Sequence, residues 1–299
     1  MGTFLALTKR NIKIFFKDKG MLFTSLITPI ILLILYATFL ANVYRDSFEG
    51  SFPEGFTFPN MKKVINGAVS GQLTSSLLAV CCVTVAFCSN TLMANDKVTG
   101  VLKDLTITPL KRHTLALSYY FGTLVTTLMV NAIALVACFI YTAINGWFMS
   151  TTDVLLLILD VTLLSMFGTA LACFVNNFLK TQGQITAVGT IVSAGYGFIC
   201  GAYMPIAQFG SAIQNIVSVL PGTYGTSLVK NHTLNGAINE MGKNLTNEVV
   251  NEIKVGMDCT PKLFGHVVNI PTMYIILIGS TILLITAYLL VNLLRKKAK

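Results

Sequence analysis

The chain has 299 residues, of which 54% are hydrophobic and only 11% carry a charge. A water-soluble domain needs far more polar surface, and uninterrupted apolar runs favour helices over a barrel, so the composition predicts an all-α polytopic membrane protein. The net charge of +9 gathers in the segments that we expect inside the cell, which indicates orientation and contact with anionic membrane lipids rather than a nucleic-acid partner.

Residues 1–20 are expected to form an amphipathic N-terminal interfacial helix on the cytoplasmic side. Lys9, Lys13 and Lys17 recur at helical spacing among apolar residues, a pattern typical of a helix in the inner headgroup layer. The remainder, residues 21–299, is expected to be one domain of six transmembrane helices, each of about 20 residues. The first span, residues 21–43, is too long an apolar run for a cleavable signal peptide.

The second span, residues 70–93, begins with polar side chains. Gln72, Thr74 and Ser75 all lie in its first turns. Hydroxyl and amide groups inside a membrane usually face another helix or a watery cavity. We interpret these residues as candidates for a substrate path, with ordinary helix packing as the alternative.

A short polar and mostly basic segment, residues 94–113, separates the second and third spans. Loops rich in Lys and Arg accumulate on the cytoplasmic side of a membrane. The segment is therefore expected to lie just inside the cell, where a cytoplasmic partner can bind it.

The pattern Thr99-Gly100-Val101-Leu102, followed by Leu105, Thr108-Pro109 and Arg112, resembles the corresponding loop of ABC type-2 exporter permeases. These are the membrane subunits of bacterial ATP-driven exporters, and the resemblance implies a coupling helix that rests on a separate ATPase. Val101 and Lys103 depart from the family pattern, which usually has Thr and Glu there. An ordinary basic loop is the alternative.

The residues that the resemblance assigns to ATPase coupling are Asp96, Thr99, Gly100, Leu102, Leu105, Thr108, Pro109 and Arg112. It also implies that the helix of residues 1–20 touches the ATPase, with a simple membrane anchor as the alternative.

The third and fourth spans, residues 115–141 and 154–178, each contain a strongly polar residue. Asn131 lies near the middle of the third span, where its amide is costly without a partner. Asp160 lies about two turns inside the outer end of the fourth span, and an ionisable residue within a span is a functional-site hypothesis by default. Both are substrate-path candidates. Hydration of Asp160 from outside, or a bond to a neighbouring helix, is the alternative.

The fifth span, residues 185–204, carries small residues four apart: Gly189, Ser193, Gly197 and Gly201. Such a ridge lets two helices approach closely. We expect the three glycines to pack against another helix, within one chain or between two, and we include Ser193 among the substrate-path candidates.

Residues 205–221 are moderately apolar but too short to cross a membrane, which predicts a re-entrant or interfacial element. The flanking stretches 201–205 and 220–224 are also similar to ABC type-2 permeases, and this resemblance implies a re-entrant helical hairpin before the last span. The outer region, residues 205–270, also contains a polar stretch, 225–269, that is expected to hold an exposed helix. This stretch is interpreted as a lid or docking surface. The last span begins after Pro271 and ends near Leu294, followed by basic residues that hold the end inside.

No catalytic or metal-binding residues are predicted. The sequence has no glycine-rich phosphate loop ending in Lys-Ser or Lys-Thr, and its three histidines stand far apart. We therefore expect no cofactor on this chain. The resemblance implies that ATP and magnesium bind to the partner ATPase subunits instead.

The sequence as a whole predicts the permease subunit of an ABC exporter in the bacterial plasma membrane, with both termini cytoplasmic. It would form a homodimer or pair with a similar permease, and export an amphipathic or lipid-like substrate such as a drug or an antimicrobial peptide. Alternatives are a lipid-linked glycan exporter, an ion-coupled secondary transporter using Asp160, an intramembrane enzyme and a signalling sensor. Cargo, transport direction and the choice of dimer partner stay open.

Overall fold

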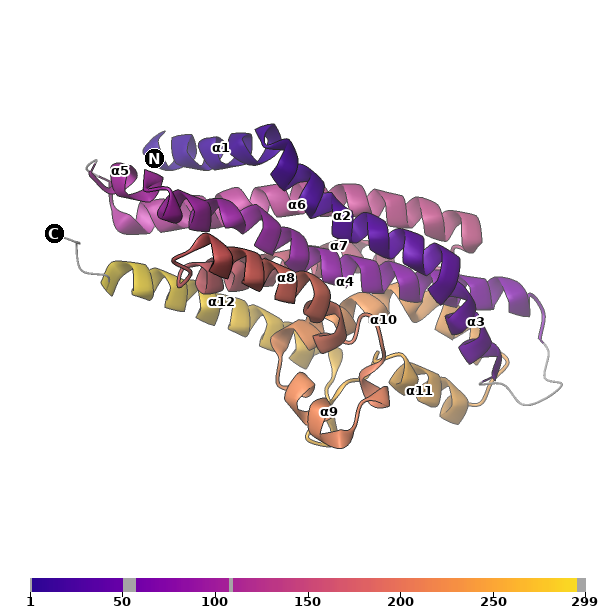
Figure 1. Cartoon of the computed structure of the whole chain (residues 1–299). Helices are drawn as coiled ribbons and strands as arrows, with labels where there is room; N and C mark the ends of the chain where they lie inside the picture. Colours follow the sequence, from indigo (N-terminus) through magenta and orange to yellow (C-terminus); the bar gives the residue numbers. More distant parts are fainter. Residues whose placement is uncertain (1, 51–57, 108–109, 295–299) are drawn as a thin grey trace.

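The computed structural model describes residues 2–50, 58–107 and 110–294. Within these residues the chain is almost entirely helical, and the one sheet is a short hairpin of two strands. The long helices run side by side in an elongated bundle (Figure 1). The predicted all-α fold of a polytopic membrane protein is confirmed.

Five helices in the described part of the chain are long and apolar enough to cross a membrane. The first, Lys19–Asp46, combines α2 (Lys19–Leu35), a π-helical turn η1 (Tyr36–Leu40) and the start of α3 (Ala41–Gly50). The other four are α4 (Met61–Val98), α6 (Arg112–Asn145), α7 (Thr151–Asn176) and α12 (Ile270–Leu294). The chain is therefore a multi-pass membrane protein.

The remaining expected span, the fifth in chain order (residues 185–204), is shorter than predicted. Its helix, α8 (Gln182–Ile199), has 18 residues and ends five positions before residue 204. The chain turns just after it at Gly201, whose φ of +72° favours glycine. The helix lies along α4 but is not among the five long apolar helices, so the count of six spans stays a prediction.

Helix α1 (Gly2–Lys17) has the expected two-sided character. Leu7, Asn11 and Phe15 are buried against the bundle, while Lys9, Lys13 and Lys17 are exposed. The helix packs mainly on α6. Figure 1 shows its N-terminus, the short helix α5 (Val101–Ile107) and the end of α12 at the same end of the bundle, which we term the inner end.

Helix α4 is the centre of the bundle. It packs against α2, α6, α7, α8 and α10 (Pro221–Gly242), and all residues from 67 to 87 are buried. Small residues permit this. A Cβ added to Gly71 would lie 2.8 Å from the carbonyl oxygen of Thr233 on α10, and one on Gly168 of α7 would lie 2.7 Å from the carbonyl oxygen of Cys82. Close glycine contacts of this kind let helix backbones approach within a membrane.

The outer region is only partly as expected. Residues 205–221 hold two short helices, η2 (Ile206–Gln208) and α9 (Ser211–Ser218), too short to span a membrane. Helix α11 (Asn247–Gly256) is largely exposed, as predicted for the polar stretch. Strands β1 (Lys262–Leu263) and β2 (His266–Val267) form an antiparallel hairpin directly before α12.

Helix α10 corrects one expectation. We expected residues 225–242 to belong to an exposed polar insertion, but α10 is buried along most of its length between α4, α7 and α12. Its hydroxyl groups bond to its own backbone, as Thr226 Oγ1 does to the carbonyl of Gly222 at 3.1 Å and Thr233 Oγ1 to that of Val229 at 2.9 Å. A polar sequence is therefore compatible with burial here, because its polar groups are satisfied internally.

Candidate functional site

The inner end contains a junction of three helices around Asp96, near the end of α4. Arg10 of α1 donates to both oxygens of the Asp96 carboxylate, at 2.8 and 3.3 Å. The hydroxyl of Tyr119 on α6 donates to the same carboxylate at 2.6 Å. The hydrogen bond to Asp96 raises the pKa of Arg10, so this guanidinium stays charged. Asp96 thereby joins α1, α4 and α6.

The next residue, Lys97, makes a second connection on another side of α4. Its Nζ donates to the carbonyl oxygens of Asn177 and Leu179, at 2.7 and 2.6 Å. These carbonyls follow the last residue of α7, where helix carbonyls lack intrahelical partners and attract cations. Two consecutive residues of α4 thus hold α1 and α6 on one side and the α7–α8 connection on the other.

The short helix α5 follows this junction after a bend. Gly100 has a φ of +90°, and Thr99 closes α4 by bonding through both its backbone N–H and its hydroxyl to the carbonyl of Asn95, each at 2.9 Å. Leu102 and Leu105 pack inward on the cluster that includes Leu7. The opposite face of α5 is exposed. It consists of Lys103, Asp104, Thr106 and Ile107.

The predicted coupling residues are therefore brought together in part. Asp96, Thr99, Gly100, Leu102 and Leu105 lie in or beside the junction, and Arg112 begins α6. Thr108 and Pro109 lie outside the described residues. Sequence reasoning missed the roles of Arg10, Lys97 and Tyr119. The only signal in the sequence was the excess of Lys and Arg over acidic residues in the inner segments, which made basic partners available to Asp96.

The substrate-path candidates of α4 and α6 lie at contacts between helices of the one chain. Thr74 and Thr142 share a hydrogen bond of 3.1 Å, and Asn131 Nδ2 donates to Ser165 Oγ at 2.8 Å. The Ser75 hydroxyl donates to the carbonyl of Gln72 at 2.8 Å. The first of these contacts corresponds to the packing alternative for Thr74, and Ser165 is a partner for the amide nitrogen of Asn131.

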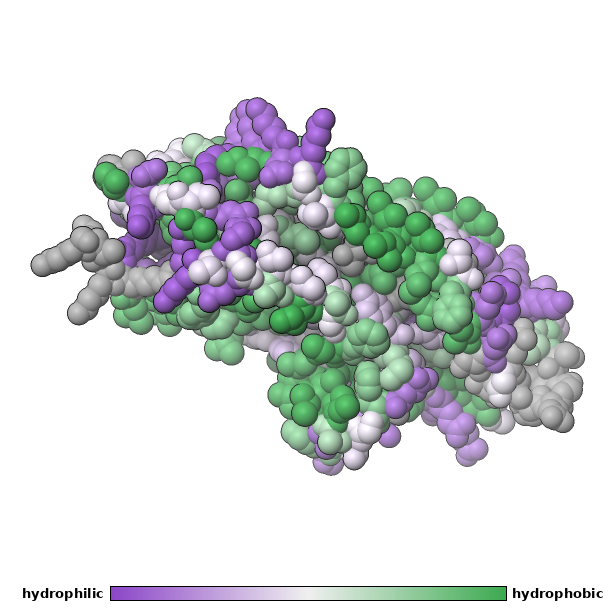
Figure 2. All heavy atoms as spheres, viewed as in Figure 1, coloured by the Kyte–Doolittle hydropathy of each residue, from purple (hydrophilic) through white to green (hydrophobic). Residues whose placement is uncertain are grey.

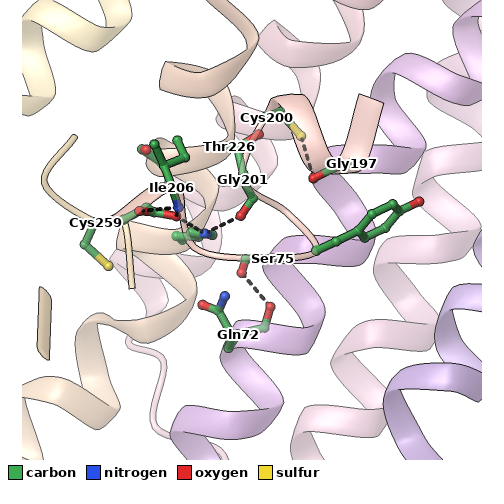
Figure 3. Close-up of polar contacts among 12 residues, drawn as sticks. Gln72, Ser75, Gly197, Cys200, Gly201, Ile206, Thr226 and Cys259 are labelled. Carbon is green, nitrogen blue, oxygen red and sulfur yellow. Dashed lines mark hydrogen bonds and ion pairs between the residues drawn. The ribbon is translucent and has the colours of Figure 1, made fainter. Parts of the chain in front are cut away.

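Gln72 is the exception among these candidates. Its side chain is fully buried, and neither carboxamide atom has a hydrogen-bond partner among the described residues. Figure 3 shows the carboxamide pointing from α4 toward the turn at Gly201. Ser193, the candidate on α8, is half-buried.

Asp160 has two partners within the chain. The hydroxyl of Tyr274 on α12 donates to Oδ1 at 2.6 Å, and Nδ1 of His232 on α10 lies 2.5 Å from Oδ2. The carboxylate is completely buried. Asp160 thus ties α7 to α10 and α12, an arrangement that favours the alternative of a bond to neighbouring helices. The partners were missed because they lie 72 and 114 positions away.

A second buried charge cluster holds the turn after α8. Lys230 Nζ donates to the carbonyl of Gly201 at 2.8 Å and to Asp258 Oδ2 at 3.1 Å. Both oxygens of Asp258 accept the backbone N–H of Ile206, at 3.0 and 2.9 Å. Figure 3 shows Gly201 and Ile206 bonded to this cluster, with Cys259 beside it and its sulfur pointing away. Sequence reasoning missed it because it placed Lys230 in an exposed stretch.

The glycine ridge of α8 does not extend as predicted. Gly201 lies beyond the end of the helix, and a Cβ added to Gly189 would meet no atom within 4 Å. Gly197 instead gives room to the ring of Tyr203, which follows on the same chain. Within the described chain, neither Gly197 nor Gly189 makes the expected contact with another helix; close glycine contacts between helices are made by α4, α6, α7 and α10.

Comparison with protein families gives one result. The family model described as ABC-2 type transporter matches residues 2–231, which include the inner junction and the first half of α10. No curated protein matches the chain. The matched region covers every element from α1 to α9.

Proposed function

The chain belongs to the ABC-2 type transporter family, and we propose that it is the permease subunit of an ATP-driven exporter whose ATPase is a separate protein. The observation that carries this proposal is the inner junction. A short helix with an exposed face, α5, follows directly on two residues, Asp96 and Lys97, that contact three other parts of the bundle.

In this proposal α5 is the coupling helix. Its exposed residues, Lys103, Asp104, Thr106 and Ile107, rest on the ATPase, and 83% of the Ile107 side chain is available for that contact. Movement of the ATPase on binding ATP and magnesium displaces α5. The ion pair of Asp96 passes the displacement to α1 and α6, and Lys97 passes it to the α7–α8 connection. A bistable set of packed contacts is what such a transition requires.

The orientation follows from the same end of the molecule. The N-terminal helix, α5 and the end of α12 lie together (Figure 1), and the chain is rich in Lys and Arg there. Positive residues favour the cytoplasmic side, so both termini are cytoplasmic in this proposal, and the membrane is the bacterial plasma membrane.

We propose a dimer, with a second copy or a similar permease, and an amphipathic or lipid-like cargo such as a drug or antimicrobial peptide. The support is the apolar character of the helices, which suits loose recognition of apolar cargo better than tight polar readout. Resistance to such compounds is the expected phenotype. A lipid-linked glycan is the second cargo class.

The test is capture and stimulation of an ATPase. The tagged chain is purified from membranes of its native host, photolabelled with a reactive ATP analogue and assayed for ATP hydrolysis in lipid nanodiscs. Ile107→Asp places a charge on the exposed face of α5, and we expect at least a tenfold loss of the ATP-labelled partner. Asn251→Asp, which also adds a negative charge at an exposed position, on α11, is the matched control. Equal capture by both variants, or no ATP-labelled partner for the unchanged chain, would refute the proposal.

A further inference from the structure

The outer region carries an exposed apolar surface that the proposed transport mechanism does not use. On α9, Ile213 is 50% exposed and Ile216 68%, and Val219 directly after the helix is 57% exposed; at the neighbouring hairpin, Phe264 is 66% exposed and Val267 53%. Strand β1 contacts α9, so the two parts form one surface. In Figure 2 hydrophobic residues gather where α9 projects from the side of the bundle.

The hairpin presents its aromatic residue at some conformational cost. Phe264 and Gly265, the two residues between the strands, have φ values of +48° and +88°. Two-residue hairpin turns of this kind usually use Asn-Gly or Asp-Gly, and an L-residue with a large side chain is disfavoured there. The turn thus holds a phenyl ring outward without packing it on the protein, which is favourable only if something apolar covers the ring.

The residues around the hairpin indicate which apolar partner covers the ring of Phe264. Strand β2 is followed within three residues by α12, whose outward face exposes Ile275, Ile278 and Ile282. This face belongs to a helix apolar enough to span a membrane, so the apolar surface of the hairpin continues the lipid-facing surface of α12. Lys262 and His266 flank the turn and are exposed. Aromatic rings beside basic groups are typical of the interface between headgroups and acyl chains.

Helix α9 lies in the stretch that the sequence predicts to be re-entrant or interfacial, and we propose that the hairpin extends it into a lipid-binding wedge, with Phe264 inserted at the boundary between the headgroups and acyl chains of the outer leaflet. The occupant is membrane lipid, and a second copy of the chain is the competing occupant. Strand β1, which begins the hairpin, starts four residues after Asp258. Asp258 binds Lys230 and the backbone of Ile206. Lipid packing around Phe264 therefore acts on the segment that holds the turn after α8. The proposal requires only that the chain spans a membrane.

The chain has a single tryptophan, Trp147, which makes the wedge testable by fluorescence. The double variant Trp147→Phe, Phe264→Trp is placed in nanodiscs containing lipids brominated near the top or near the end of the acyl chain. We expect shallow bromine to quench at least half of the emission, deep bromine to quench less, and aqueous acrylamide to quench weakly. Ile216→Trp in the same background should behave likewise.

The matched control is Glu252→Trp in the Trp147→Phe background, on the exposed face of α11. It should be quenched by acrylamide and not by brominated lipid. The proposal is overturned if position 264 behaves like position 252. It is also overturned if the tryptophan at 264 is shielded from both quenchers and becomes accessible on dilution to one chain per disc, which would show that a second copy covers it. Unchanged helical circular dichroism establishes folding of each variant.

Discussion

The two ends of the molecule use the same chemistry in different surroundings. At the inner end, Arg10 pairs with Asp96, and the two side chains are 29% and 9% exposed. In the outer half, Lys230 pairs with Asp258, and the two side chains are 0% and 7% exposed. Water and salt weaken the first pair, whereas the second is shielded from both. The inner pair can therefore rearrange at little cost, while the outer pair fixes the turn after α8.

The largest expected effect concerns the outer pair. Lys230→Met leaves the buried carboxylate of Asp258 without its cation, which is expected to destabilise the fold by about 3–5 kcal/mol. Thermal unfolding in detergent measures it. The exposed substitution Lys62→Met is the control, and adding Asp258→Asn should restore much of the loss. If Lys230→Met loses no more stability than Lys62→Met, the buried pair does not contribute to the stability of the fold.

The next effect concerns Asp160. Asp160→Ala leaves His232 and the hydroxyl of Tyr274 without their acceptor, at a cost of about 1–3 kcal/mol. Asp160→Asn keeps an acceptor and should cost less. In a transport assay Asp160→Asn should retain ATP-driven export. Loss of ion-driven uptake in that variant, without loss of folding, would favour the secondary-transporter alternative instead.

A smaller effect on stability is expected at the inner junction, with a larger effect on coupling. Arg10→Gln should cost about 1 kcal/mol or less, because the pair is partly solvated. It should nevertheless reduce ATPase stimulation several-fold, while Lys13→Gln, an exposed change on the same helix, should not. High salt should reduce stimulation of the unchanged chain in the same direction. The salt dependence of the Lys230–Asp258 pair is measured by thermal unfolding. If salt weakens this pair as much as the Arg10–Asp96 pair, the two ends do not differ as we expect.

The smallest effect concerns Cys259, beside the outer pair. Burial raises the pKa of this thiol to about 12. The thiolate is the reactive form, so alkylation of the folded chain should be slow at pH 8 and should keep rising about tenfold per pH unit beyond pH 9, where an ordinary thiol reaches a plateau. Mass spectrometry of the peptide containing Cys259 measures the rate. A plateau near pH 9 would show that the outer cluster is open to water.

The sequence predicted the spanning helices well, since long apolar runs can be satisfied in a membrane only as helices or barrels. The prediction of an exposed stretch was wrong at α10. Hydropathy scores Thr226, Lys230 and Thr233 as polar, but each has a hydrogen-bond partner inside the protein. The same limit applies to the candidate sites. Asp160 could be singled out as a carboxylate within a span and Asp96 by its place in the family pattern, but Arg10 and His232 could not be paired with them before the fold was known.

Helix α4 has a consequence for how the protein sits in the bilayer. Its 38 residues extend about 57 Å at the usual rise per residue, whereas the hydrocarbon core is about 30 Å thick. Its charged residues lie near its two ends, at Lys62 and Lys63 and at Asp96 and Lys97. A displacement of a few ångströms along its own axis therefore draws no charge into hydrocarbon. The bilayer offers little resistance to such a piston-like movement, and only the contacts with neighbouring helices restrain it.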